Sequence, residues 1–445
     1  MSSLLSTYSE KLRASYWFIP AIMVTISIAL SFIVIAIDEA FPIRLQDILG
    51  WIDISDPDGA YSFLSTVSGA MIGVTGVTFS ITIVALVQAS SQFGPRLLNN
   101  FLRDRGNQFV LGTFISTYTY CLFVLRSITN TPEVLFIPNL AMFVALVLAV
   151  MSIVVLVYFF HHVTVILQAE HVIAEVGREL EQAIERLFPE SLDYSIYARE
   201  LRNKEDIPPF LQEDASSTID SEVGGYLQAI DVEALVGIAE EYDAVLRAAN
   251  KPGDFVTKDG PLIEVWSGDS DLEEIYQKVK DSFIIGDQRL RINDVEFSVD
   301  QLVEIAVRAL SPGINDPFTA MACIDQLASG VSQLVQRTIP SGYHYGSEGT
   351  LRLITEPLTF SGILEASFNQ IRQNAYSDVA VTIRLLEAIS AIAPHIRTRE
   401  QRDTLSRQAQ MLHRASEEHI PEKWDREDAT ERFESTMETL EESEQ

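Results

Sequence analysis

Apolar and polar positions divide the chain near residue 160. Before that point, four long stretches are almost free of charge, at about 17–37, 61–89, 108–126 and 138–160. A helix needs roughly 20 mostly apolar residues to cross a bilayer. The first stretch exceeds the apolar core of a signal peptide and lacks a small-residue cleavage pattern. The pattern therefore predicts four transmembrane helices within residues 1–160.

After residue 160 the periodicity is that of a mixed α+β region. The fourth span runs on without a helix breaker to about residue 188, and Pro208 and Pro209 mark a linker, so we assign 161–216 to a helical extension and linker. Strand-like alternation with turn residues predicts a small α+β, barrel-like subdomain at 217–296. Helical periodicity dominates 297–416.

The last segment, 417–445, has 12 acidic and 3 basic residues, which predicts a frayed acidic helix or a disordered tail. The expected fold class is thus an integral membrane α-helical domain with four transmembrane helices, followed by an α+β cytoplasmic domain. That domain would contain a small β-barrel-like element and a helical bundle.

The segment KPGDFVTKDGPLIEV supports the barrel-like element. The spacing of Gly253 and Gly260 is similar to the tight corners of barrel-sandwich-hybrid domains of the lipoyl and biotinyl type, with one extra residue before Gly260. Lys258 falls inside the corner, where it is not presented as a swinging arm. We therefore expect a small barrel that uses glycine where φ is positive, and no carrier function.

Basic residues near the spans set the expected orientation. Five lie on one side of the membrane and two on the other: Lys11, Arg13, Arg96, Arg103 and Arg105 against Arg44 and Arg126. Lys and Arg accumulate in short cytoplasmic loops. Both termini are therefore expected in the cytoplasm.

Charge narrows the classes of partner. From residue 161 onward the sequence holds 25 basic and 53 acidic residues. Such a field opposes nucleic acid and favours a basic or cationic cytoplasmic partner. It equally suits solubility or a saline habitat.

Catalytic and cofactor signals are lacking in the sequence. It contains no Walker loop, no Gly-x-Ser-x-Gly, no His-Glu-x-x-His and no dinucleotide fingerprint. His161, His162 and His171 are spaced for different helix faces, which disfavours a zinc site. Cys121 and Cys323 lie in different regions, so no disulfide is expected. We expect neither enzyme activity nor a cofactor.

Small and hydroxyl residues concentrate in the second and third spans. Either they let helices pack closely, or they line a pore and replace part of an ion's hydration shell. We expect these two spans to face the bundle interior or an oligomer axis, with the first and fourth toward lipid. The candidate positions are Gly69, Gly73, Gly76 and Ser80 on one face of the second span, Ser68, Thr75, Thr78 and Thr82 on another, and Thr113, Thr117 and Tyr120 in the third.

No span has an ionisable residue near its middle, which argues against a proton-coupled transporter. Gly94 and Pro95 end the second span. The arginines that follow, Arg96, Arg103 and Arg105, either anchor helices at the lipid headgroups or form a basic ring that attracts anions to the cytoplasmic mouth of a pore.

The stretch ALSPGINDPFTA, residues 309–320, reads as a turn between two helices. Pro312 ends the first helix after Ser311, and Gly313 can take a positive φ. Asn315 or Asp316 caps the second helix, with Pro317 in its first position. The other interpretations are a gating or intersubunit contact, or a ligand site.

Three stretches together resemble a domain-of-unknown-function family of bacterial predicted membrane proteins: LVEIAVRALSPGINDPFTAMACIDQL, FSITIVALVQASSQFGPRLL and KPGDFVTKDGPLIEV. The resemblance extends over most of the chain. It implies a protein of the bacterial inner (plasma) membrane with four spans and a cytoplasmic domain. It implies no activity and no catalytic residues.

The leading hypothesis is a homo-oligomeric inner-membrane protein that conducts ions or small solutes, with the cytoplasmic domain as an assembly platform or sensor. The alternative is a non-conducting membrane scaffold or signalling protein that docks a cytoplasmic partner. A membrane enzyme of unknown type comes third, and only the polar turn at 311–316 supports it.

Overall fold

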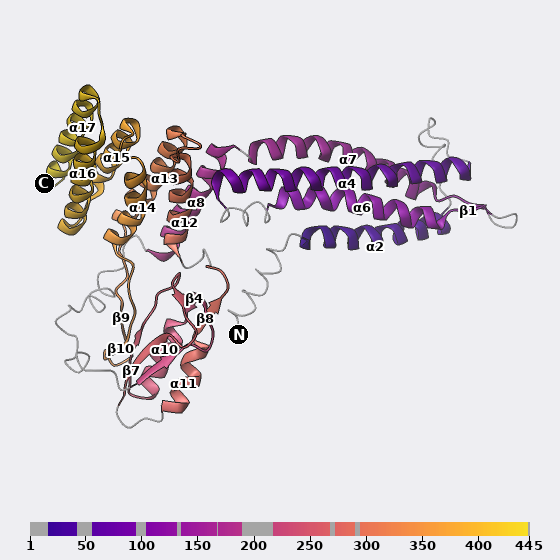
Figure 1. Ribbon diagram of the computed structural model, residues 1–445. Helices are drawn as coiled ribbons and strands as arrows, with labels where there is room; N and C mark the ends of the chain where they lie inside the picture. The colour runs from indigo at the N-terminus through magenta and orange to yellow at the C-terminus, as the bar shows by residue number, and fades with distance from the viewer. Residues whose placement is uncertain are drawn as a thin grey trace. The chain divides into compact units, whose positions relative to one another are not determined.

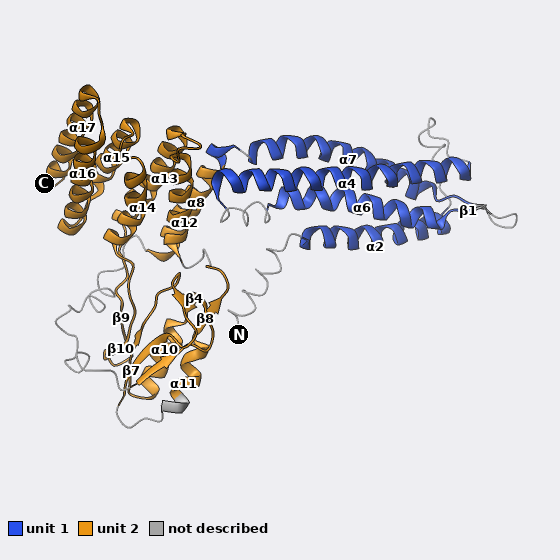
Figure 2. Cartoon of the chain, viewed as in Figure 1, with its two compact units in different colours: residues 1–171 blue, residues 172–445 orange. Residues whose placement is uncertain are grey.

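The structure is a computed structural model that describes residues 17–41, 56–94, 104–130, 135–166, 168–188, 217–267, 272–289 and 294–443 (Figure 1). The chain divides into two compact units, residues 1–171 and 172–445 (Figure 2). Within the described residues, four helices of the first unit are long and apolar enough to cross a membrane, as the hydrophobic pattern predicts.

The first unit consists of long helices and a short antiparallel hairpin: α2 (Phe18–Ala40), α4 (Pro57–Phe93), α6 (Arg105–Ser127), β1 (Thr129–Asn130), β2 (Leu135–Phe136) and α7 (Asn139–Ile166). α6 packs against α2, α4 and α7. In its most apolar stretch 56% of residues are buried, against 17% in both α2 and α4. The third span is therefore the interior helix, whereas the second is as exposed in the single chain as the first.

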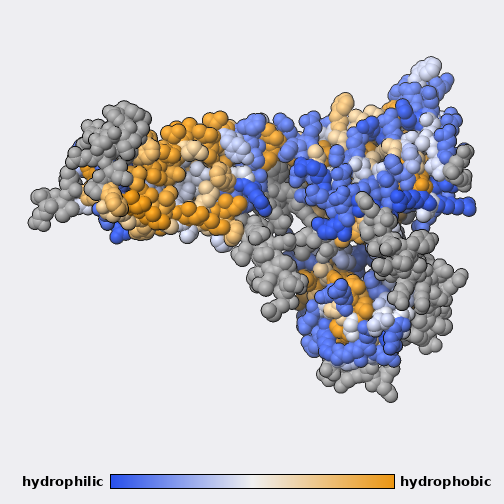
Figure 3. All heavy atoms as spheres, turned by 180° about the vertical axis from the view of Figure 1, so that it is seen from behind, coloured by the Kyte–Doolittle hydropathy of each residue, from blue (hydrophilic) through white to orange (hydrophobic). Residues whose placement is uncertain are grey.

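The outer surface of the first unit is apolar. On the face shown in Figure 3 its described surface is mostly hydrophobic, whereas that of the second unit is mostly hydrophilic. Large side chains such as Phe32, Val84 and Val157 are exposed there. Contiguous apolar surface on this scale is expected where lipid replaces water.

One carboxylate lies at the end of an apolar helix and has a structural role. Asp38, in the last turn of α2, accepts hydrogen bonds from the backbone N–H groups of Leu140 (3.0 Å) and Ala141 (2.9 Å). These groups belong to the first turn of α7, where N–H groups lack partners within the helix. Asp38 thus joins the ends of two helices that are about a hundred residues apart in sequence.

The fourth span does not run on as one helix, which corrects the expectation of an unbroken extension. α7 ends at Ile166 and α8 spans Ala169–Leu187. No proline or glycine marks the break, since the local sequence is VILQAEH. The division between the two units falls shortly after this break, within the first turn of α8.

The strands of the second unit form two sheets, β3-β7-β5-β10-β9 and β6-β4-β8. β10 runs parallel to β5, and the other pairings are antiparallel. Their helices are α10 (Val232–Glu241) and α11 (Leu272–Asp281). The strands are β3 (Ser217–Asp220), β4 (Gly225–Ile230), β5 (Val245–Ala248), β6 (Phe255–Val256), β7 (Pro261–Trp266), β8 (Phe283–Gly286), β9 (Tyr343–Tyr345) and β10 (Leu351–Ile354).

The expected barrel is wrong for the described residues, because these strands form open sheets rather than a closed barrel. Local alternation does not reveal that β10 pairs with β5, since Leu353 lies opposite Leu246 across more than a hundred residues of sequence. The corner conformations differ in part as well. Gly253 has a φ of +102°, as expected, but at the second corner Asp259 (+61°) takes the left-handed conformation instead of Gly260.

The rest of the second unit is helical: α12 (Val295–Ala309), α13 (Pro317–Val335), α14 (Phe360–Asn374), α15 (Val379–Ile392), α16 (Arg399–His419) and α17 (Lys423–Glu442). α17 matches the acidic helix that was one of the two alternatives expected for the tail, but it packs on α15 and α16 instead of fraying. Ala429, Thr436 and Leu440 are buried, and the Thr436 hydroxyl lies 3.3 Å from the Leu386 carbonyl oxygen. Stacking of Phe433 on His413 adds a further contact, so the acidic helix is anchored along one face.

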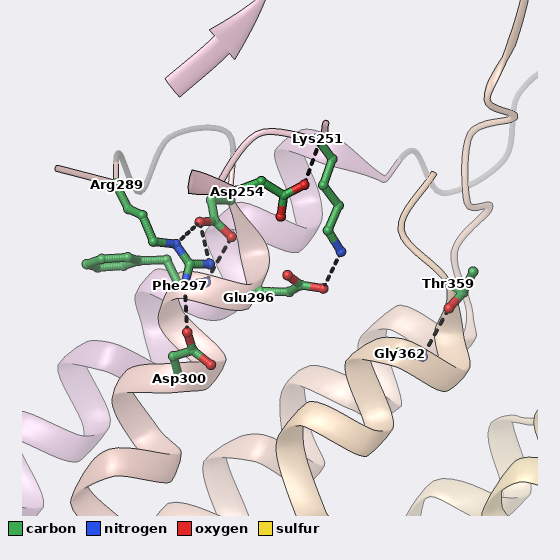
Figure 4. A network of polar contacts seen from close by, with 9 residues as sticks. Lys251, Asp254, Arg289, Glu296, Phe297, Asp300, Thr359 and Gly362 are labelled. Atoms are coloured by element: carbon green, nitrogen blue, oxygen red, sulfur yellow. Dashed lines mark hydrogen bonds and ion pairs between the residues drawn. The ribbon is translucent and has the colours of Figure 1, made fainter. Parts of the chain in front are cut away.

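A polar network joins the first corner of the sheets to the start of α12 (Figure 4). Arg289 donates to Asp294 (Nε to Oδ2, 2.8 Å) and to Asp300 (Nη1 to Oδ2, 2.7 Å), and Lys251 pairs with Glu296 at 3.0 Å. Burial raises the pKa of the Asp294 carboxyl, and the charge of Arg289 opposes that effect. A Cβ on Gly253 would lie 2.7 Å from Asp294 Oδ2, so glycine is needed there for space as well as for φ.

Candidate functional site

α4 has two opposite faces that the sequence analysis distinguished by spacing. The inner face packs inside the first unit, where Ser68, Thr78 and Thr82 are buried and Thr75 is half-buried. The Thr82 hydroxyl donates to the Thr78 carbonyl oxygen at 2.9 Å. These hydroxyl residues are therefore packing residues within one chain.

The opposite side of α4, which we call the open face, has no partner among the described residues. It consists of exposed small residues at helical spacing: Ser62, Thr66, Gly69, Gly73, Gly76 and Ser80. A Cβ built on any of the three glycines meets nothing within 4 Å. At about 1.5 Å per residue the face is roughly 27 Å long, close to the roughly 30 Å of a bilayer's hydrocarbon core.

Two hydroxyls of the open face donate to their own helix and so act as hydrogen-bond acceptors toward the outside. The Ser80 hydroxyl donates to the Gly76 carbonyl oxygen (2.9 Å), and that of Thr66 donates to the Ser62 carbonyl oxygen (2.7 Å). A hydroxyl that donates to its own helix keeps lone pairs for an outside donor or cation. The glycines leave the backbone uncovered. The face therefore presents acceptors and no charge.

The predicted residues of the third span lie elsewhere, in the interior. Thr113, Thr117 and Tyr120 of α6 are buried. The hydroxyls of Thr117 and Ser152 on α7 are 3.2 Å apart, and the Tyr120 hydroxyl donates to the Ala141 carbonyl oxygen at 3.2 Å. The structure therefore separates the candidate set into buried helix contacts and the open face of α4.

Two glycines outside the predicted set lie at close contacts between helices of the first unit. A Cβ on Gly112 of α6 would lie 2.5 Å from Met23 Sδ and 3.3 Å from Pro20 Cα of α2. Gly106 lies against the ring of His162, whose Nε2 is 2.7 Å from Asp104 Oδ2. Gly112 has Ser116 four residues further on, so its small-xxx-small spacing was a usable signal, whereas Gly106 has no small residue at that spacing. The glycine series of α4 contacts nothing among the described residues.

The predicted arginine mouth is described only in part. Arg105 is exposed at the first position of α6 and lines a surface pocket of about 520 Å³ together with Phe109 and Tyr158. Arg96 and Arg103 lie outside the described residues. Whether the three form a ring therefore stays a prediction.

The turn between α12 and α13 is built as predicted, with one exception. The N–H groups of Ile314 and Asn315 donate to the Ser311 carbonyl oxygen at 3.0 and 2.9 Å. Asn315 takes the left-handed conformation with a φ of +52°, whereas Gly313 is not among the described glycines with positive φ. Asparagine tolerates this conformation because its short polar side chain can bond locally.

Asp316, not Asn315, caps α13, and Pro317 holds the first helical position as expected. Asp316 accepts from both the N–H (3.1 Å) and the hydroxyl (2.6 Å) of Thr319. This carboxylate already occupies the helix N-terminus, which disfavours an anion there. Ile314 and Phe318 beside the cap are 48% and 76% exposed. They give the turn an apolar surface.

Comparison with known families identifies the chain. The family described as Predicted membrane protein (DUF2254) matches residues 13–391. This chain belongs to that family. Its match spans the four candidate membrane helices and the 309–320 turn, whereas α16 and α17 follow its last residue.

Relatives in mycobacteria share nearly the whole chain. An uncharacterised protein of Mycobacterium bovis and one of Mycobacterium tuberculosis are each 30% identical over 425 residues, which cover 94% of this chain and 79% of each relative. No solved structure matches the chain. The predicted family resemblance is confirmed, and the chain is a predicted membrane protein with four candidate spans.

Proposed function

We propose that this protein is a homo-oligomer of the bacterial inner membrane that conducts ions or small solutes along an axis lined by the open face of α4. One observation carries the proposal: a small, hydroxyl-bearing face nearly as long as the hydrocarbon core lacks a partner within the described chain. Lipid tails offer nothing to its acceptors, whereas water, an ion or another copy does.

The flanks of the open face suit contacts between copies. Exposed Ile72 and Phe79 border it on one side and Val77 on the other. Bulky flanks from neighbouring copies would pack together and leave the glycines toward the axis. In this arrangement the second unit serves as the cytoplasmic assembly platform or sensor, with both termini in the cytoplasm.

Cations are the favoured solute. The open face presents oxygen acceptors, and α4 has no charged residue after Asp58. The excess of acidic residues after residue 160 raises the local cation concentration. The arginine mouth would favour anions instead, so the sign of the conducted ion distinguishes the two predictions.

Reconstitution of the full chain tests the proposal. We expect an oligomer in mild detergent and potassium flux in vesicles. Gly73→Leu should reduce the flux roughly tenfold or more, because the side chain would fill the axis. Gly237→Leu is the matched control, since Gly237 is also a helical glycine whose Cβ meets open space. A monomeric protein with silent vesicles under voltage, tension and pH steps contradicts it.

A non-conducting scaffold is the second candidate, and the exposed Ile314 and Phe318 favour it. Large exposed apolar side chains next to a rigid, capped turn suit a protein contact. The full chain should then retain a basic cytoplasmic partner that Phe318→Ser releases, while vesicles stay silent. We propose no enzyme activity, because the polar turn that alone suggested it uses Asp316 as a helix cap.

A further inference from the structure

A surface pocket of about 480 Å³ lies between the C-terminal turns of α14 and α16. Arg372 and Tyr376 line it from the side of α14, and Arg414, Glu418 and His419 from α16. Two arginines thus face one cavity. Neither the predicted pore nor the turn at 309–320 includes any of these residues.

The contacts that lead to the pocket along the two helices are complementary. Arg407 of α16 lies 3.9 Å from Glu365 of α14, and Gln408 donates to Asn369 at 3.0 Å. About two turns beyond Glu365 and Arg407, the equivalent positions hold Arg372 and Arg414. The series of matched partners therefore ends in a pair of like charges.

Neither arginine is paired with a carboxylate anywhere in the described part of the chain. The Nε of Arg372 is buried and has no hydrogen-bond partner there. Burial, and then the charge of Arg414, lower the pKa of the Arg372 guanidinium. The chain has 62 acidic residues against 32 basic ones, so a shortage of carboxylates does not explain why these two arginines are unpaired. Buried donors without a partner are costly.

Helix ends explain only part of this arrangement. The partial negative charge at a helix C-terminus favours a cation in the last turn, and Arg372 occupies that turn of α14. Arg414 lies more than a turn before the end of α16 at His419. The helix dipole accounts for one cation and not for two in a single cavity with a buried, unused N–H.

An aromatic wall completes the pocket. The rings of Tyr376 and His419 make an edge-on contact with centroids 4.9 Å apart, and His419 Nδ1 is held by the Ala415 carbonyl oxygen at 3.1 Å. Tyr376 remains 49% exposed, so part of its ring is accessible. Guanidinium groups match phosphate oxygens in geometry and charge, and exposed rings suit the organic part of a ligand.

We propose that this pocket binds a phosphate monoester, with Arg372 and Arg414 holding the phosphate oxygens and Tyr376 contacting the organic group. The exposed Glu418 at the same pocket disfavours a second anionic group. The proposal does not rest on conduction, because the pocket belongs to the second unit and α4 to the first.

Calorimetric titration of the purified full chain with phenyl phosphate, at constant ionic strength set by chloride, tests the site. We expect saturable binding that Arg372→Gln and Arg414→Gln each weaken roughly tenfold or more, since a hydrogen bond to a charged group is lost. Arg399→Gln is the control, because Arg399 is exposed on the same helix and makes an ordinary pair with Asp403. Absence of binding at millimolar phenyl phosphate, or equal weakening by all three variants, overturns the proposal.

Two further arms separate the source of the phosphate and a purely structural role. A short-chain phosphatidic acid that binds tighter than phenyl phosphate, with the same arginine dependence, assigns the monoester to a lipid headgroup. The reverse order assigns it to a soluble compound. Without ligand, Arg414→Gln should leave the thermal midpoint unchanged or raise it, because a like-charge contact is removed. A lowered midpoint together with unchanged binding contradicts a ligand site.

Discussion

α6 and α4 both contain small and hydroxyl residues, but several of those of α6 are buried between helices, whereas the glycine series of α4 is exposed. In α6 the hydroxyls of Thr117 and Tyr120 form hydrogen bonds with α7, and Gly112 packs against α2. In α4 the glycine series Gly69, Gly73 and Gly76 meets nothing. Composition alone therefore does not separate a packed helix face from an exposed one. The difference lies in whether another helix of the same chain reaches the face.

The second unit repeats this contrast with charged groups. Arg289 is enclosed by Asp294 and Asp300. Arg372 instead shares its pocket with Arg414. The charge of Arg289 is balanced by carboxylates of the same chain, whereas a bound anion would balance the charges of Arg372 and Arg414. Mutation of a contact that is satisfied within the chain should lower the free energy of unfolding. Mutation of an exposed, unpartnered group should instead weaken ligand binding or assembly.

The largest effect is expected at the complete charged contact. Arg289→Ala should lower the free energy of unfolding of the second unit by about 3 kcal/mol, because it leaves the buried Asp294 without a counter-charge. Hydrogen exchange of α12 peptides in the full chain measures this change. Arg399→Ala, at an exposed pair, should cost less than about 1 kcal/mol. Equal losses in the two variants would show that the network is not a special contact.

The glycines give the second test of the comparison. Gly112→Leu should destabilise the first unit by about 1–3 kcal/mol, because a Cβ there already crowds Met23 and the backbone of Pro20. Gly73→Leu should leave the stability of the single chain unchanged and reduce flux through the axis. Unfolding in mixed micelles and potassium flux in vesicles report the two effects. If both substitutions destabilise the monomer alike, α4 has no open face.

A half-buried histidine should respond to pH. His344 of β9 lies 3.0 Å from the Thr355 hydroxyl, and burial lowers the pKa of its imidazole. The unfolded chain then binds the proton more readily, so stability falls as pH drops below about 6.5. Each pKa unit between the two states costs about 1.4 kcal/mol below the folded-state pKa. Protection of β10 peptides against hydrogen exchange, corrected for intrinsic rates, should fall between pH 7 and pH 5.

His344→Gln provides the control for that experiment. The variant lacks the titrating group while it retains a donor for the Thr355 hydroxyl. Its protection of β10 should therefore change less between the two pH values. A variant that loses as much protection as the original chain assigns the pH dependence to other groups.

The smallest effect is expected at the membrane hydroxyls. Thr117→Val should lower the stability of the first unit by about 0.6 kcal/mol, the typical contribution of one hydrogen bond between membrane helices. The variant loses the hydrogen bond to Ser152. A double-mutant cycle with Ser152→Ala in mixed micelles measures the coupling. Thr66→Val on the open face should show no coupling to Ser152. Comparable coupling at the two positions would contradict the separation of the faces.

Local patterns predicted much of this molecule. Stretches almost free of charge and about as long as a bilayer crossing located the four candidate spans, because the length of an apolar run is a property of neighbouring residues. The cap at Asp316 and the first-turn Pro317 followed from residue type and position in the same way. Among the sheets, the strand-like alternation within 217–296 correctly predicted strands such as β4.

Failures occurred where a distant segment decides the outcome. The barrel prediction missed the pairing of β10 with β5 across a long stretch of sequence. The tail prediction left an acidic helix and a disordered segment open, because charge counting does not show that one face of α17 packs on α15. At the turn, the left-handed residue is Asn315 and not Gly313. Either residue type tolerates that conformation, so residue type alone does not tell which of the two adopts it. In the structure the N–H groups of Ile314 and Asn315 donate to the Ser311 carbonyl oxygen, and Asn315 is the left-handed residue.

The sequence by itself determined the four candidate spans, the two small-residue faces of α4 and the cap of α13. It did so because helical periodicity and hydropathy depend on near neighbours. Only the tertiary structure decided which face of α4 is covered, that α6 is the interior helix, and that Arg372 meets Arg414. These features depend on segments brought together by folding, which local spacing does not encode.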